Sequence, residues 1–162
     1  MSKNQITIEQ LNAACRHFQE MLALGVTENF AIRQLELFAN SYAKFHVVGN
    51  VSPDHVNDYQ LWSDAALTLT RDNPNCRKEG LLRVEHGTPR RQFARIIFER
   101  WKTAEITEVW MKQQIQDLWK VAVITVEEDR RLNKIARSKL FNNPFDRWRS
   151  AGIEFKETAR SG

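Results

Sequence analysis

The sequence predicts a single domain of the α+β class, predominantly helical, in which an N-terminal three-helix unit precedes a small sheet of two or three strands fenced by helices. Apolar residues recur at intervals of three to four along several stretches, as in helices with one buried face. Gly and Pro are scarce, with 6 and 4 residues in a chain of 162, which favours long helices over many short strands joined by turns. Short β-branched or alternating runs begin only after Gly80, and these predict the strands.

The first three helices are predicted by the signals at their ends. A capping-box pattern at Thr7 opens the first helix, and Gly25 ends it. Thr27 can cap the second helix, which runs to about Gly49. Ser52-Pro53 is typical of an N-cap followed by proline at the first helical position, so it predicts the start of the third helix.

The second half of the chain alternates between strand and helix signals. A cap followed by proline, a second capping box and apolar periodicity predict helices after Thr88-Pro89, from about Thr107 to Leu118, from Thr125, and from Phe145 to Ala151. The predicted strands are Leu81–Glu85, Val121–Ile124 and Ile153–Phe155.

Charge divides the predicted domain 1–162 into a helical subregion at residues 1–79 and a basic α+β subregion at 80–157, with a frayed tail at 158–162. Residues 1–80 carry 7 Lys and Arg against 9 Asp and Glu, whereas residues 81–162 carry 17 against 11. A basic half of this kind suits an anionic partner, either nucleic acid or an acidic protein surface, although a solvated basic surface has the same composition.

Cysteine content and hydropathy predict a cytoplasmic protein without a membrane partner. Cys15 and Cys76 have no partner at zinc-ligand spacing, so we expect two free thiols in a reducing compartment. No run approaches the roughly 18 apolar residues of a membrane span, and residues 1–5 lead into no apolar signal segment.

The first candidate for chemistry is the pair Glu85-His86, at the end of a predicted strand and just before a capped helix. An imidazole there can act as a general base near neutral pH, and the adjacent carboxylate can bind Mg²⁺ or orient the ring. Arg90 and Arg91 follow within a turn and can bind phosphate near the helix N-terminus. The alternative is structural, with His86 bonded to a backbone carbonyl and Glu85 paired with a neighbouring Arg.

The helix that follows the second strand supplies further candidates. Its first turn is acidic, which stabilises a helix dipole, and Asp129 is the residue expected to face the same sheet end as His86. Basic residues then follow at helical spacing, and an aromatic residue further on is suited to stacking, or else the series is a solvated helix face. The candidates for anion or nucleic-acid binding are Arg130, Lys134, Arg137, Lys139 and Trp148.

Over residues 81–135 this order of elements resembles a degenerate HNH, or His-Me-finger, nuclease. In that family a His at the end of the first strand activates water, and residues of that strand and of the following helix hold one metal ion. The resemblance implies that His86 is the base and that Glu85 and Asp129 are ligands of a divalent metal such as Mg²⁺. This chain departs from the family pattern because about 35 mostly helical residues separate the two strands.

Two main hypotheses for function follow. The first is a small nucleic-acid-acting protein, specifically a metal-dependent endonuclease of the defence or toxin type. The second is a non-enzymatic binding module, for example a phage-encoded or cytosolic inhibitor, whose basic surface binds nucleic acid or an acidic protein partner. The third hypothesis is a structural or oligomer-forming domain with neither activity.

Overall fold

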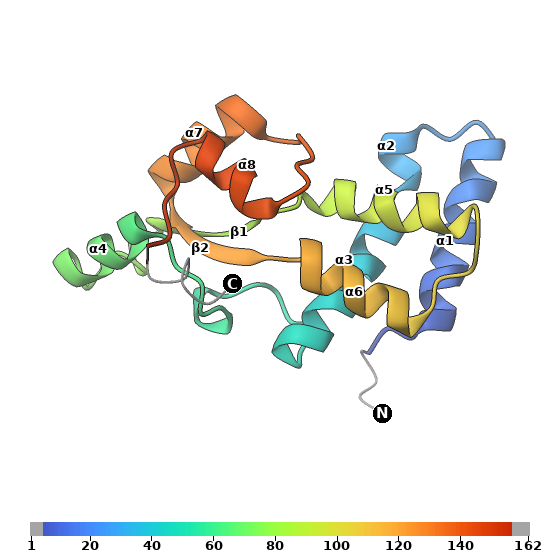
Figure 1. The fold of residues 1–162 in the computed structure, drawn as a ribbon, viewed down its shortest axis with the longest axis horizontal. Helices are drawn as coiled ribbons and strands as arrows, with labels where there is room; N and C mark the ends of the chain where they lie inside the picture. Colours follow the sequence, from blue (N-terminus) through green and yellow to red (C-terminus); the bar gives the residue numbers. More distant parts are fainter. Residues whose placement is uncertain (1–4, 157–162) are drawn as a thin grey trace. The chain divides into compact units, whose positions relative to one another are not determined.

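A computed structural model describes residues 5–156, and the predicted frayed tail at 158–162 lies outside the described residues. Its helices and one two-stranded antiparallel sheet, counted within residues 5–156, confirm the predicted fold class (Figure 1). The chain divides into two compact units, Met1–Ser52 with Arg90–Asp117 and Pro53–Pro89 with Leu118–Gly162. Each unit combines two separate stretches of chain, so the units do not coincide with the predicted subregions 1–79 and 80–157.

The first unit is helical, and α1, α3 and α5 pack against one another in it. The capping box at Thr7 forms as predicted, because the Thr7 hydroxyl accepts a hydrogen bond from the Gln10 amide. Asn12 is buried and bonds the backbone of Ile106 in both directions, at 3.0 and 2.8 Å, which ties the segment before α6 to α1. The helices are α1 (Ile8–Ala23), α2 (Glu28–Ala31), α3 (Arg33–Val48), α5 (Arg90–Trp101) and α6 (Glu108–Leu118).

The second unit contains the sheet. Strand β1 (Leu82–His86) pairs antiparallel with β2 (Val121–Thr125), and Glu85 lies opposite Ala122 in the register. Helices α7 and α8 lie together on one side of this sheet in Figure 1. The helical elements of the unit are the short 3₁₀ helix η1 (Val56–Asp58), α4 (Asp64–Asp72), α7 (Val126–Ala136) and α8 (Pro144–Ser150).

The predicted third helix begins later than Ser52-Pro53 suggests. Only η1 and then α4, capped by the Ser63 hydroxyl, are helical in this stretch. The backbone between them pairs with β2 instead, since Val123 donates to the Leu61 carbonyl at 2.8 Å and Ser63 donates to the Val123 carbonyl at 3.0 Å. A helix running through this stretch would need the same backbone groups, so the sheet pairing displaces it.

The predicted strand Ile153–Phe155 is wrong, because these residues form no ladder with the sheet. Ile153 and Phe155 are buried instead among the side chains of α7, α8 and β2. Their apolar alternation therefore reflects core packing in an irregular segment. One backbone bond, from the Asp64 amide to the Glu154 carbonyl at 2.9 Å, fixes the segment to the start of α4.

Close packing joins the end of β1 to α8 within the second unit. A Cβ placed on Gly87 would lie 2.5 Å from the Pro144 Cβ and 3.0 Å from the Trp148 ring. Glycine is therefore required directly after His86, and it lets the chain leave the strand in contact with α8.

Both cysteines are free and buried, Cys15 in the first unit and Cys76 in the second. Burial raises the pKa of the Cys15 thiol to about 12, so this thiol stays protonated and unreactive at neutral pH. Within residues 5–156, none of the helices combines the length and apolar character that a transmembrane span requires.

Candidate functional site

Helix α7 is fixed along one face by buried contacts. The Thr125 hydroxyl caps the helix by accepting from the Glu128 amide, and the Glu128 carboxylate accepts a hydrogen bond from the Thr125 amide at 2.9 Å. The same buried carboxylate accepts from the Ser63 hydroxyl at 2.7 Å, which links α7 to the start of α4. Leu132 and Ala136 continue this buried face into the core, so the rotation of α7 about its axis is determined.

The opposite face of α7 is basic and exposed. Arg130, Lys134 and Arg137 follow one another at intervals of four and three residues, and at about 100° per residue they lie opposite the buried face. Lys139 follows just beyond the helix end and is also exposed. We call these four residues the basic face.

The charges of the basic face have no acidic partner among residues 5–156. Neighbouring cations do have one, since Arg131 lies 3.9 Å from Glu127, and Arg149 lies 2.9 Å from Asp146. The basic face is thus a row of uncompensated positive charge, which attracts anions through water.

The C-terminal end of α7 is held by Arg147 of α8, whose side chain is 2% exposed. Its guanidinium donates to the carbonyls of Ala136 and Arg137, both at 3.0 Å, and so binds the last turn of the helix. It also donates to the His86 carbonyl at 2.9 Å and to the Glu85 carboxylate at 2.8 Å. One buried cation therefore joins α8, the end of α7 and the end of β1.

Glu85 is engaged by this cation. Burial raises the pKa of the Glu85 carboxyl above its ordinary value, Arg147 opposes the rise through its hydrogen bond and its charge, and the negative charge of Asp129 adds to it. Glu85 and Asp129 are thus near enough to interact, with an Arg bound to Glu85. The ion pair between Glu85 and Arg147 matches the alternative hypothesis from the sequence, in which Glu85 has a structural role and pairs with an Arg.

His86 points to the other face of β1, because successive side chains of a strand alternate. Its Nε2 lies 3.8 Å from an Asp54 carboxylate oxygen, and its ring meets the edge of Trp119 at 5.7 Å between centroids. Asp54 in turn accepts a hydrogen bond from the Tyr59 hydroxyl at 2.6 Å. The imidazole is 11% exposed, so it is largely covered from any large substrate.

The predicted convergence of Glu85, His86 and Asp129 on one metal is not seen. Across the described part of the chain, no group of three or more His, Cys, Asp or Glu side chains is placed to hold a metal ion. The alternation along β1 explains this, because it turns Glu85 and His86 away from each other.

The remaining predicted residues divide between the two units. Arg91 belongs to the first unit and donates to the Glu36 carboxylate at 3.2 Å and the Asn29 side chain at 2.8 Å, while Arg90 is exposed at the start of α5. Trp148 is fully buried between Phe145 and Phe155 and cannot stack on a nucleic-acid base, so that expectation is corrected.

The buried role of Arg147 was not among the sequence predictions. The signal was available in the helical spacing of Pro144, Arg147, Trp148 and Ala151, which share one face at i, i+3, i+4 and i+7. Because the other three are core residues, an Arg among them had to be buried and paired.

Comparison of the chain with protein-family models, with curated proteins and with solved structures finds no match.

Replacement of Arg147 by Met preserves the approximate length of the side chain but removes the guanidinium group. Glu85 and three backbone carbonyls then lose their hydrogen-bond donor. We expect the free energy of unfolding to fall by about 3–5 kcal/mol, measured by urea denaturation. Arg149→Met, on the same helix but at an exposed ion pair, is the matched control and should change it by less than about 1 kcal/mol. Equal effects of the two variants would contradict the role given to Arg147.

The raised pKa of Glu85 makes stability depend on pH. Between the ordinary value of 4.5 and the higher value in the folded chain, the folded state binds more protons than the unfolded state, so stability falls as pH rises. Glu85→Gln removes this titration. The stability of the wild-type chain relative to Glu85→Gln should therefore decrease as pH rises above 4.5, in urea denaturation at a series of pH values. An increase in this relative stability above pH 4.5 would mean that the lowering of the Glu85 pKa by Arg147 is larger than the raising by burial.

Proposed function

We propose that the protein binds the phosphate backbone of a nucleic acid through the basic face of α7. The observation that carries the proposal is a row of exposed cations, with no acidic partner among residues 5–156, on a helix whose opposite face is packed into the core. A fixed helix loses little conformational freedom on binding, which favours affinity.

The spacing of these charges supports a polyanion rather than a single small anion. At a rise of about 1.5 Å per residue, Arg130, Lys134 and Arg137 are separated by about 6 and 4.5 Å along the helix axis. A duplex strand repeats its charges about every 3.4 Å along the duplex axis, so cations spread over about 10 Å of helix can contact more than one phosphate at once, with release of bound counterions.

Binding through contacts with the phosphates of a nucleic acid weakens as salt concentration rises and depends little on the nucleotide sequence. The logarithm of the binding constant should fall linearly with the logarithm of salt concentration, with a slope of about −0.9 per phosphate contacted on duplex DNA. Fluorescence anisotropy of labelled duplex DNA, single-stranded DNA and RNA over a KCl series measures this slope.

Neutralising the basic face should weaken binding and flatten its salt dependence. For Arg130→Gln/Lys134→Gln/Arg137→Gln we expect the slope to become smaller in magnitude by about 3 units. The matched control is Arg16→Gln/Lys78→Gln/Lys112→Gln, which removes three exposed positive charges that do not belong to the basic face. Equal losses in the two triple variants would refute a site on α7. Binding of polyglutamate as tightly as nucleic acid at the same salt would favour the acidic-protein alternative instead.

The endonuclease predicted from the resemblance remains a second proposal, supported by sequence order rather than by the placement of its residues. It predicts that DNA or RNA is cleaved with Mg²⁺ or Mn²⁺ and that His86→Ala abolishes cleavage. The binding proposal predicts that His86→Ala leaves nucleic-acid affinity unchanged. Cleavage lost in His86→Ala, with folding verified by circular dichroism, would establish the enzyme and reverse our preference.

A further inference from the structure

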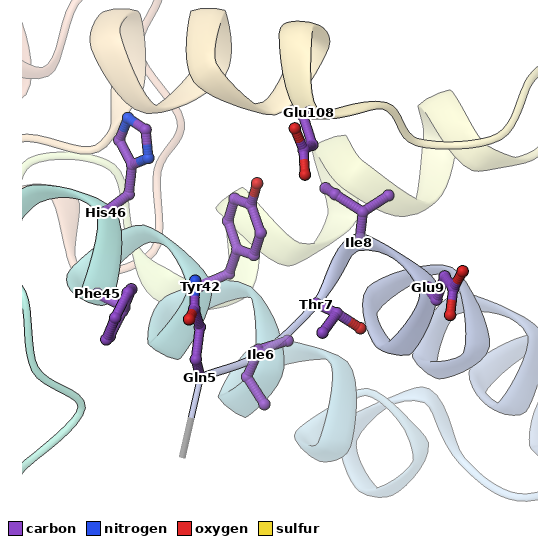
Figure 2. A pocket seen from close by; sticks show the side chains of 9 residues that line it. All are labelled: Gln5, Ile6, Thr7, Ile8, Glu9, Tyr42, Phe45, His46 and Glu108. Atoms are coloured by element: carbon purple, nitrogen blue, oxygen red, sulfur yellow. The ribbon is translucent and has the colours of Figure 1, made fainter. Parts of the chain in front are cut away.

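The first unit carries an open pocket of about 670 Å³, formed by the start of α1 with the residues before it, α3 and the first residue of α6. Figure 2 shows the Tyr42 hydroxyl and the Glu108 carboxylate pointing toward each other, with the Ile8 side chain beside them. The volume falls in the range of about 300–1,000 Å³ that is usual for small-molecule sites.

The walls of the pocket are fixed by contacts within the unit. The Thr7 capping box sets the start of α1, and the two bonds between Asn12 and Ile106 hold the segment that leads to Glu108. Tyr42 lies on α3, next to the buried Ala43 that anchors this helix in the core. The pocket is therefore largely preformed, which reduces the entropy lost on binding.

The chemistry of the lining is acidic and aromatic. Glu9 and Glu108 belong to the lining, and in Figure 2 only Glu108 of the two points toward Tyr42. Tyr42, Phe45 and His46 supply three rings, and no Lys or Arg among residues 5–156 lines the pocket. The charge of the described lining is therefore negative, whereas the chain as a whole carries a net charge of +4. The Tyr42 hydroxyl makes no hydrogen bond within residues 5–156, and burial together with the Glu108 charge raises the pKa of the phenol.

We propose that this pocket binds a small organic cation, an amine carried on an apolar or aromatic body. The ammonium group donates hydrogen bonds to the Glu108 carboxylate and the Tyr42 oxygen, which face each other in Figure 2. Ile8 packs against the apolar body. Among the described lining residues an anion would meet the Glu108 carboxylate and no Lys or Arg, and within residues 5–156 no group of three His, Cys, Asp or Glu side chains is placed to hold a bare metal ion.

This inference is independent of nucleic-acid binding, because it concerns the other unit and the opposite charge. The test is a titration of the ¹⁵N-labelled full chain, followed by NMR, with phenethylamine. Its neutral and anionic analogues, 2-phenylethanol and 3-phenylpropionate, have the same ring and similar size. We expect saturable shifts of the amides of Tyr42, Phe45 and Glu108 with phenethylamine, at a millimolar Kd, and none with the other two probes.

Glu108→Gln should raise the Kd for phenethylamine about tenfold, since it removes one charge-assisted hydrogen bond. Tyr42→Phe, which removes only the hydroxyl, should raise it by a smaller factor. Glu105→Gln is the matched control, because it removes the same charge three residues away and outside the lining, and should leave the Kd within about twofold. Absence of saturable shifts, equal binding of 2-phenylethanol, or equal effects of Glu108→Gln and Glu105→Gln would each overturn the proposal.

Discussion

The second unit depends on the burial of one guanidinium group. Arg147 gives up hydration, and four hydrogen bonds to α7, β1 and the Glu85 carboxylate offset that loss. A neutral side chain could not satisfy three carbonyls and a carboxylate at once, and Lys lacks the planar fork that does so. The end of the strand, the end of α7 and α8 are therefore joined through a single residue.

This arrangement decides which surface of α7 is available for binding. Glu128 fixes the N-terminal turn and Arg147 fixes the C-terminal turn, so the exposed face between them is determined by packing rather than by its own sequence. That face carries the unpaired cations on which the proposed function rests. The pocket of the first unit is acidic, so each unit offers a fixed surface of its own charge, suited to a ligand of the opposite charge.

Local signals explain which features the sequence predicts. The caps at Thr7 and Thr125, the two strands and the basic spacing on α7 each depend on residues within one or two turns of chain. Long-range pairing explains the rest. The bonds of Leu61 and Ser63 to β2 replace a locally plausible helix start, and this pairing cannot be deduced from a single stretch of sequence. By contrast, the opposite orientation of Glu85 and His86 follows from the alternation of side chains along any strand, once β1 extends to His86.

Arg147 and Glu85 interact as a buried pair that joins the elements of the second unit. A double-mutant cycle with Arg147→Met and Glu85→Gln, followed by urea denaturation, measures their coupling directly. We expect a coupling energy of about 1–3 kcal/mol, against less than about 0.5 kcal/mol for Arg149→Met with Asp146→Asn at the exposed pair of the same helix. Equal coupling in the two cycles would contradict this role of the buried pair.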